Sequence, residues 1–188
     1  MNVLTIMASP HESGNTATVL GWVEEELESN GHNLERIELR KFNVNDCIGC
    51  LACQGSEDFK CAQTSDDANE LFSRLAAADA LVFASPLYCW SFPAAMHALL
   101  NRGLSQVKGY GMENHISTLD GKPTALLVTC MGPIEGNADL VGQVFDRVCD
   151  FAQMRKTGEL VVPFCTIPDE IGKNARKQAL ILARALVD

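Results

Sequence analysis

Two common phosphate-binding signatures are missing from this 188-residue chain. It has no GxxxxGK[ST] motif, which argues against a P-loop nucleoside triphosphatase, and no GxGxxG motif, which argues against a Rossmann dinucleotide site. No Lys or Arg precedes Arg36, so a phosphate bound near the amino terminus would meet neutral donors and a helix dipole. That environment suits a tightly held monophosphate better than a triphosphate that is hydrolysed.

Long apolar runs and a leader pattern are also missing. Leu81–Tyr88 is among the longest apolar stretches, and Asp79 lies just before it, so no segment reaches the length of a membrane-spanning helix. The first residues, Met1–Ile6, carry no positive charge and do not resemble a secretion signal. We expect a soluble, cytoplasmic protein without a membrane partner.

Positive charge is scarce. Fifteen Lys and Arg stand against 24 Asp and Glu, a formal net charge of -9, which argues against nucleic acid as a partner. Apolar residues make up 47% and charged residues 21%, as in ordinary globular chains. The length suits a single domain over residues 1–188.

Apolar strand-like segments and amphipathic helix-like segments alternate from end to end, and Gly103–Gly121 reads as a polar loop. Such alternation predicts an α/β fold, a doubly wound three-layer αβα sandwich with a five-stranded parallel sheet of order 2-1-3-4-5. Ligands of such sheets bind at the carboxyl ends of the strands. The expected strands are 3–8, 34–39, 80–85, 123–130 and 159–164, and the expected helices are 16–30, 66–78, 92–102, 137–154 and 173–187.

The loop after the first expected strand is suited to phosphate. Ser9, Ser13, Asn15 and Thr16 supply short neutral donors at a helix amino terminus, and Gly14 lets the backbone approach closely. His11 lies in the same loop, near the expected phosphate. The alternative is helix capping, in which Ser13 or Asn15 satisfies the free N–H groups without any ligand.

Two motifs together resemble a known family. Ala8-Ser9-Pro10 with Gly14-Asn15-Thr16-Ala17, and Ser85-Pro86-Leu87-Tyr88 before a helix that ends Leu100-Asn101-Arg102, are similar to the NADPH-dependent FMN reductase branch of the flavodoxin-like superfamily. The resemblance covers nearly the whole chain and implies a flavodoxin-like fold with bound FMN. It implies phosphate contacts from Ser9, Ser13, Asn15, Thr16 and Ala17, and ring contacts from Pro86, Leu87, Tyr88, Cys89 and Trp90.

The second loop has the right chemistry for a flavin ring. An isoalloxazine needs flat apolar walls and backbone N–H groups at its polar edge. Tyr88 and Trp90 could form the walls, and backbone groups of 87–91, including Ser91, and of Met131 and Gly132 could reach the edge. The alternative is that both aromatic residues belong to the core.

Four of the eight cysteines form a compact motif. Cys47, Cys50, Cys53 and Cys61 give the spacing C-x2-C-x2-C-x7-C, whose first three members match four-iron clusters of bacterial ferredoxins. Zinc and reduced thiols without metal are the alternatives. The motif is similar to that of the iron–sulfur flavoproteins, a subgroup of the same family, which implies a 4Fe-4S cluster on these four residues. The seven-residue gap before Cys61 is longer than expected for that subgroup.

We therefore expect an FMN-dependent oxidoreductase in which NAD(P)H delivers hydride to the flavin, with electrons passing to a redox partner or small-molecule acceptor. No general acid or base is visible, so no catalytic residue is assigned. A flavodoxin-type electron carrier and a flavin-free metal or thiol sensor are the alternative functions. By analogy with the family, a homodimer or homotetramer is expected, with segment 103–121 near a neighbouring subunit's flavin.

Overall fold

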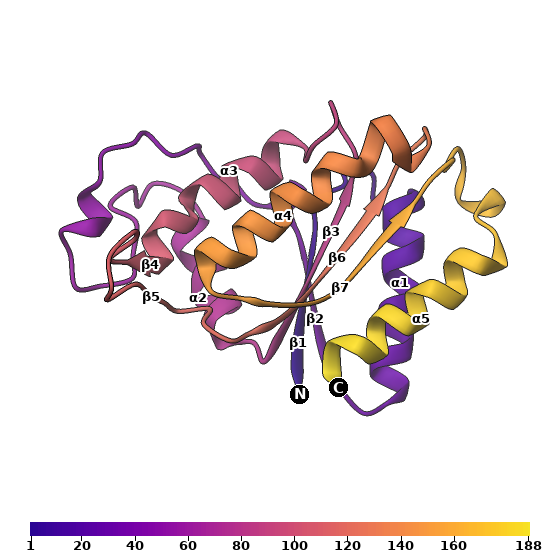
Figure 1. The fold of residues 1–188 in the computed structure, drawn as a ribbon, viewed down its shortest axis with the longest axis horizontal. Helices are drawn as coiled ribbons and strands as arrows, with labels where there is room; N and C mark the ends of the chain where they lie inside the picture. Colours follow the sequence, from indigo (N-terminus) through magenta and orange to yellow (C-terminus); the bar gives the residue numbers. More distant parts are fainter.

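The computed structural model describes residues Met1–Asp188, which are built around one five-stranded parallel sheet (Figure 1). Its strand order, β2-β1-β3-β6-β7, is the predicted 2-1-3-4-5 order once the separate β4–β5 hairpin is set aside. The sheet strands are β1 (Asn2–Met7), β2 (Asn33–Glu38), β3 (Ala80–Pro86), β6 (Pro123–Thr129) and β7 (Arg155–Val162). The predicted flavodoxin-like α/β class is therefore confirmed.

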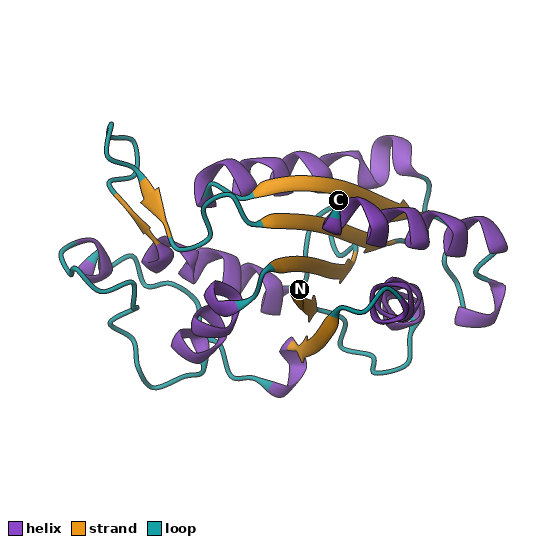
Figure 2. Cartoon of the chain, turned by 90° about the horizontal axis from the view of Figure 1, so that it is seen from below, coloured by secondary structure: helices purple, strands orange, loops and turns teal.

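Helices cover both faces of the sheet (Figures 1 and 2). They are α1 (Asn15–Ser29), α2 (Ala68–Ala77), α3 (Ala94–Arg102), α4 (Asp139–Ala152) and α5 (Lys173–Val187). The α1 and α5 helices pack on one face, and α2, α3 and α4 pack on the other. None of the helices combines the length and apolar character needed to span a bilayer.

Successive side chains of the central strands point to opposite faces of the sheet, which gives the protein two hydrophobic cores, one on each face. In β1, Leu4 and Ile6 point into the core beneath α2, α3 and α4, whereas Val3 and Met7 point into the core beneath α1 and α5. A strand buried on both faces therefore appears in the sequence as a continuous apolar run.

Three predicted boundaries were wrong, each for a local reason. The last sheet strand starts at Arg155, not at 159, because an edge strand tolerates the polar residues that pair with the start of β6. The fourth long helix starts at Asp139, after an irregular turn in which Gly136 has a φ of +69°. The second helix starts at Ala68 because the Asp66 carboxylate accepts the Ala68 N–H ahead of it.

The predicted loop 103–121 contains more structure than expected. A 3-10 turn at Gly103–Gln106 leads into an antiparallel hairpin of β4 (Val107–Lys108) and β5 (Ile116–Ser117). In Figure 2 this hairpin projects from the end of the molecule opposite the arrowheads of the sheet. Two-residue strands carry too little periodicity to be recognised from sequence.

Candidate functional site

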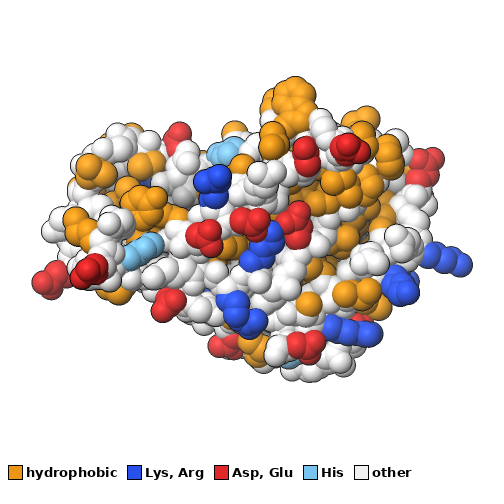
Figure 3. All heavy atoms as spheres, in the orientation of Figure 1, with side chains coloured by type: hydrophobic (Ala, Val, Ile, Leu, Met, Phe, Trp, Pro, Cys, Tyr) orange, Lys and Arg blue, Asp and Glu red, His pale blue; other side chains and the backbone are white.

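A cavity of about 380 Å³ opens at the carboxyl ends of the strands, between the loops that follow β1, β3, β6 and β7. This is the edge at which ligands of doubly wound sheets bind. Figure 3 shows apolar side chains gathered on the surface over the ends of β6 and β7, between α4 and α5. The cavity is lined by Ser9, His11, Gly14, Asn15, Thr16, Pro86, Leu87, Tyr88, Thr129, Cys130, Met131, Cys165, Thr166 and Pro168.

The amino terminus of α1 faces this cavity with unsatisfied donors. Gly14 is the N-cap residue, and no side chain caps the helix. The backbone N–H groups of Asn15, Thr16 and Ala17 make no hydrogen bond within the chain. Capping by Ser13 or Asn15, the alternative open at the sequence level, does not occur. These N–H groups and the helix dipole are therefore available to an anion.

Asn15 adds an unpaired polar atom at the same place. Its Nδ2 donates to the Thr166 carbonyl oxygen at 3.3 Å, whereas its Oδ1 is buried and has no partner. A buried acceptor without a donor is costly unless a ligand supplies one. A ligand that carries both a phosphate and hydroxyl groups, as FMN does, fits these residues.

The floor of the cavity is uncharged. The Thr16 and Thr129 hydroxyl groups lie 2.8 Å apart and are buried. Burial raises the pKa of the Cys130 thiol and also that of the Cys165 thiol, so both stay neutral near pH 7. No Lys or Arg lines the cavity. An anion here would meet neither a repelling thiolate nor an attracting cation.

The loop after β3 forms a tight two-residue turn. Tyr88 and Ser91 exchange backbone hydrogen bonds of 2.9 and 3.0 Å, and the residues between them have φ values of +48° at Cys89 and +60° at Trp90. Such a turn is usually built from Asn and Gly, because other side chains are strained in the left-handed region. Strain of this kind concentrates at functional sites.

The same turn leaves recognition groups open. The N–H groups of Cys89 and Trp90 make no hydrogen bond within the chain. The side chains of Tyr88 and Trp90 are 44% and 59% exposed, so neither is a core aromatic. Flat apolar surface beside free N–H groups suits the edge of an isoalloxazine ring.

The structure brings together most, but not all, of the predicted cofactor residues. Eight of them line the cavity: Ser9, His11, Asn15, Thr16, Pro86, Leu87, Tyr88 and Met131. Six lie outside its lining, in the same loops or next to them: Ser13, Ala17, Cys89, Trp90, Ser91 and Gly132.

Sequence reasoning missed the contribution of the loop after β7. Cys165, Thr166 and Pro168 line the cavity, as does Thr129 at the end of β6. The signal was available, because this loop also follows the carboxyl end of a strand. It was overlooked because the loop carries no motif residues, although the predicted end of the strand, Phe164, lies only two residues beyond the observed end, Val162.

The four motif cysteines lie in the long loop between β2 and α2, and their surroundings differ. Cys50 is exposed and Cys47 is half-buried, whereas Cys53 and Cys61 are buried. The hairpin segment supports the loop: Gln54 Nε2 donates to the Leu104 and Val107 carbonyl oxygens at 2.9 and 2.8 Å. The predicted loop 103–121 thus packs against the cysteine loop of its own chain.

Helix α3 connects this loop to the turn at the cavity. His97 Nε2 lies 3.1 Å from Ser91 Oγ, and Asn101 Nδ2 donates to Asp46 Oδ1 at 2.8 Å. Asp46 in turn accepts the Cys47 N–H at 2.8 Å. The first motif cysteine and the cavity turn are therefore both attached to one rigid element.

The sulfur environments indicate what the motif can hold. No three His, Cys, Asp or Glu side chains are close enough to share one metal ion. In a four-iron cluster each thiolate binds a different iron. Two sulfurs already accept N–H groups, Cys47 from Gly49 at 3.4 Å and Cys61 from Arg102 at 3.1 Å. Such donors stabilise ligated thiolates, so the donor set fits a cluster.

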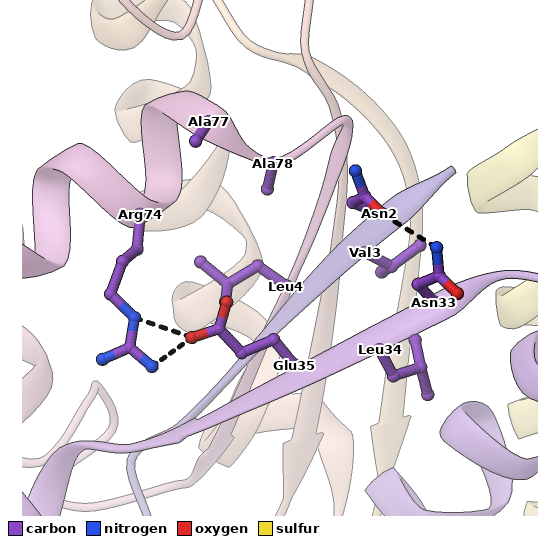
Figure 4. Close-up of a pocket in the computed structure, with 9 residues that line it drawn as sticks. All are labelled: Asn2, Val3, Leu4, Asn33, Leu34, Glu35, Arg74, Ala77 and Ala78. Atoms are coloured by element: carbon purple, nitrogen blue, oxygen red, sulfur yellow. Dashed lines mark hydrogen bonds and ion pairs between the residues drawn. The ribbon is translucent and has the colours of Figure 1, made fainter.

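A second cavity, of about 370 Å³, lies at the other end of the strands, where β1 and β2 begin (Figure 4). It is lined by the starts of β1 and β2 and the end of α2. Arg74 there pairs with Glu35, and Asn33 Nδ2 donates to Asn2 Oδ1 at 3.1 Å. These polar groups satisfy one another, and the cavity lies away from the edge that binds ligands.

The sheet order and its two layers of helices define a flavodoxin-like protein, with the open amino terminus of α1 and the turn after β3 at the edge where such sheets bind ligands. The sequence matches the family model of NADPH-dependent FMN reductases over residues 1–158, and the chain belongs to this family. It is accordingly an FMN-dependent oxidoreductase.

Individual relatives agree with this assignment. The chain is 30% identical, over its full length and 80% of the relative, to an iron-sulfur flavoprotein of Archaeoglobus fulgidus. It is 28% identical to an iron-sulfur flavoprotein of Methanosarcina thermophila over 62% of this chain and 60% of the relative.

Solved structures share the fold at low identity. An FMN-dependent NADH-azoreductase of Bacillus anthracis, solved in complex with FMN, superposes with a TM-score of 0.75 at 16% identity over 100% of both chains. An NAD(P)H:quinone oxidoreductase of Methanothermobacter marburgensis gives 0.72 at 18% identity over 98% of this chain and 95% of that one.

Proposed function

We propose that the cavity at the carboxyl ends of the strands holds FMN, with the phosphate at the start of α1 and the ring beside Tyr88 and Trp90. The observation that carries this proposal is the uncapped amino terminus of α1, whose free N–H groups face the cavity. Ser9 and Thr16 add hydroxyl groups in the lining, and Ser13 adds one from the same loop. The unpaired Oδ1 of Asn15 would accept a hydrogen bond from a ribityl hydroxyl group. The whole chain, residues 1–188, acts as one FMN-binding domain.

Bound FMN supplies hydride acceptance and the release of electrons singly or in pairs. The chain's own residues position it. The left-handed turn at Cys89 and Trp90 leaves two backbone N–H groups free, which would hydrogen-bond to the polar edge of the ring, and half-buried Leu87 would cover part of its apolar surface. The titratable side chains in the lining are His11, Tyr88, Cys130 and Cys165, and no proton-transfer role is assigned to any of them.

The electron donor we propose is NAD(P)H. The exposed side chains of Trp90 and Met131, 59% and 77% accessible, leave the mouth of the site open to a planar nicotinamide. Steady-state oxidation of NAD(P)H by the purified protein tests this donor. A flavodoxin-type carrier without turnover is the outcome that would contradict it.

We further propose that Cys47, Cys50, Cys53 and Cys61 bind a 4Fe-4S cluster. Support comes from their ferredoxin-like spacing, from the N–H groups that already point at two of the sulfurs, and from the name of the full-length relative in Archaeoglobus fulgidus. Iron and sulfide assays after anaerobic reconstitution test it. A reconstituted protein with less than one iron per chain would contradict it.

Assembly and location follow from the family by analogy. We propose a cytoplasmic homodimer or homotetramer, with the hairpin of β4 and β5 available to a second subunit through the exposed side chains of Tyr110 and Met112. Sedimentation of the FMN-loaded protein tests the oligomeric state.

The phosphate position has a sharp test in Asn15→Asp. This isosteric change adds a negative charge at the amino terminus of α1 and removes the weak Nδ2 bond to the Thr166 carbonyl oxygen. Without ligand the helix dipole favours the charge by about 0.3–1 kcal/mol. With ligand the new carboxylate repels the phosphate. We expect FMN affinity to fall at least about tenfold, which is 1.4 kcal/mol. Riboflavin, which has no phosphate, should bind as before.

The matched control is Asn174→Asp, the same substitution at an exposed position in the first turn of α5. It should leave FMN affinity unchanged. Equal loss of FMN and riboflavin affinity in Asn15→Asp would show that the phosphate lies elsewhere.

A further inference from the structure

A fully buried guanidinium lies beside the cysteine loop. Arg102, the last residue of α3, is 1% exposed, and its side chain and that of Asp66 are both completely buried. Its nitrogens donate to five acceptors: Asp66 Oδ2 at 2.6 Å, Asp66 Oδ1 at 3.2 Å, Asn45 O at 2.9 Å, Gln63 O at 3.0 Å and Cys61 Sγ at 3.1 Å.

These contacts join both ends of the cysteine loop. Asn45 precedes the first motif cysteine, while Gln63 and Asp66 follow the last. A charge removed from water must be paired and hydrogen-bonded, and Asp66 with the two carbonyl oxygens meets that requirement. The bond to Cys61 is additional to this neutralisation.

The orientation of the pair is specific. The Nη1 and Nη2 atoms of Arg102 face Asp66, and Nε faces the sulfur of Cys61. The positive end of a buried, neutral ion pair therefore points at a proposed cluster ligand. In a buried setting such a dipole acts with little screening from water.

We propose that Arg102 tunes the reduction potential of the cluster through its Nε–H donation to Cys61. This inference rests on the proposed cluster. Reduction adds one electron to an anionic thiolate-bound cluster, with no bond made or broken. The N–H donor and the positive end of the Arg102–Asp66 pair stabilise the reduced form and raise the potential. A higher potential favours electron flow from flavin to cluster.

A purely structural role for Arg102 makes a different prediction. If it only closed the loop, its replacement would lower stability and iron retention but leave the potential of any assembled cluster unchanged. The potential is therefore the deciding measurement, and the flavin potential in the same molecule is an internal reference.

The experiment compares anaerobically reconstituted wild-type protein with Arg102→Lys and with the charge-neutral double variant Arg102→Met/Asp66→Asn. Redox titration followed by electron paramagnetic resonance gives the cluster potential. We expect the cluster potential of the double variant to be lower than that of wild type. At a given potential the ratio of oxidised to reduced cluster should be about tenfold higher, which corresponds to a shift of about 59 mV for one electron. Arg102→Lys should shift it less, in the same direction, and the flavin potential should not move.

The matched control is Arg74→Met/Glu35→Gln, which removes a partly exposed pair at the far edge of the sheet. It should leave both potentials unchanged. A fully assembled cluster with wild-type potential in the double variant would overturn this inference and leave the cluster proposal intact. Absence of iron in reconstituted wild type would overturn both, with FMN binding unaffected.

A measurement on wild type covers the case in which the variants do not fold. Protein labelled with ¹⁵N in its arginine side chains should show a ¹⁵N hyperfine coupling in the reduced cluster, because one N–H donates to a ligand sulfur. Lack of any ¹⁵N coupling would overturn the inference without use of a variant.

Discussion

The hydroxyl group of Thr16, in the first turn of α1, lies 2.8 Å from the hydroxyl group of Thr129, the last residue of β6. The strand that leads into α1 is β1, and it is not a neighbour of β6, because β3 lies between them in the sheet. This buried hydrogen bond thus fixes the start of α1 relative to the far wall of the cavity.

Replacement of either threonine by valine should leave the other hydroxyl buried without a partner. We expect Thr16→Val and Thr129→Val each to lower the free energy of unfolding by about 1–2 kcal/mol, and the double variant to lose about 1 kcal/mol less than the sum. Urea unfolding of the apo protein measures both. Thr157→Val on the edge strand is the control, and strict additivity would show that the two hydroxyl groups are not coupled.

The left-handed turn after β3 predicts opposite effects for two substitutions at one exposed position. Asn tolerates the φ of +48° at Cys89, whereas a β-branched side chain does not. Cys89→Asn should raise the melting temperature of the apo protein, and Cys89→Val should lower it, with free-energy changes of about 1 kcal/mol in each direction. Equal effects of Asn and Val would mean that the turn is unstrained.

Thiol reactivity should follow burial. Burial raises the pKa of Cys149 to about 12, so at pH 8 about one molecule in ten thousand carries this thiolate. Iodoacetamide should label exposed Cys50 and Cys89 in the native apo protein and leave Cys149 unmodified, as measured by peptide mass spectrometry. FMN should slow labelling at Cys89 and not at Cys50. Rapid native labelling of Cys149 would contradict the structure of α4.

Acid stability should depend on Asp66. Burial raises the pKa of this carboxyl group, but hydrogen bonds from Arg102 and from the Asn45 and Ala68 backbones outweigh burial and leave the pKa below its ordinary value. A lowered pKa in the folded state contributes stability above the unfolded value of about 3.9, and this stability is lost as pH falls through the folded value. Asp66→Asn should therefore cost about 3–5 kcal/mol near pH 7.

The difference in unfolding free energy between wild type and Asp66→Asn should shrink below about pH 4. Denaturant unfolding from pH 3 to pH 7 checks this dependence. Asp120→Asn, at an exposed carboxylate that makes no side-chain hydrogen bond or ion pair, is the comparison variant. A difference that stays constant down to pH 3 would contradict the proposed ion-pair contribution.

The regular part of the fold could be predicted because its causes are local. The α1 helix shows its buried face through Val19, Leu20 and Val23, and the central strands are apolar on both sides. The strand order followed from the alternation of elements and the handedness of crossovers. The positions of Ser9 and Tyr88 at strand ends then placed two walls of the cavity.

The remaining features depend on contacts distant in sequence. Nothing local marks Arg102 as buried, since its acceptors lie 36 to 57 positions away. The left-handed conformation of Trp90 is imposed by the pairing of Tyr88 with Ser91, against the preference of the side chain. The loop after β7 has no motif residues, and only the position of its strand shows that Thr166 reaches the cavity.

The absence of Lys and Arg from the cavity lining has a thermodynamic consequence. A phosphate dianion held by peptide dipoles and hydroxyl groups has no Lys or Arg side chain beside it, so salt has no close ion pair to screen. Few counterions leave the protein when such an anion binds. Cofactor retention should consequently vary little between dilute buffer and molar sodium chloride. A cell could then change its internal salt widely without stripping the flavin from this protein.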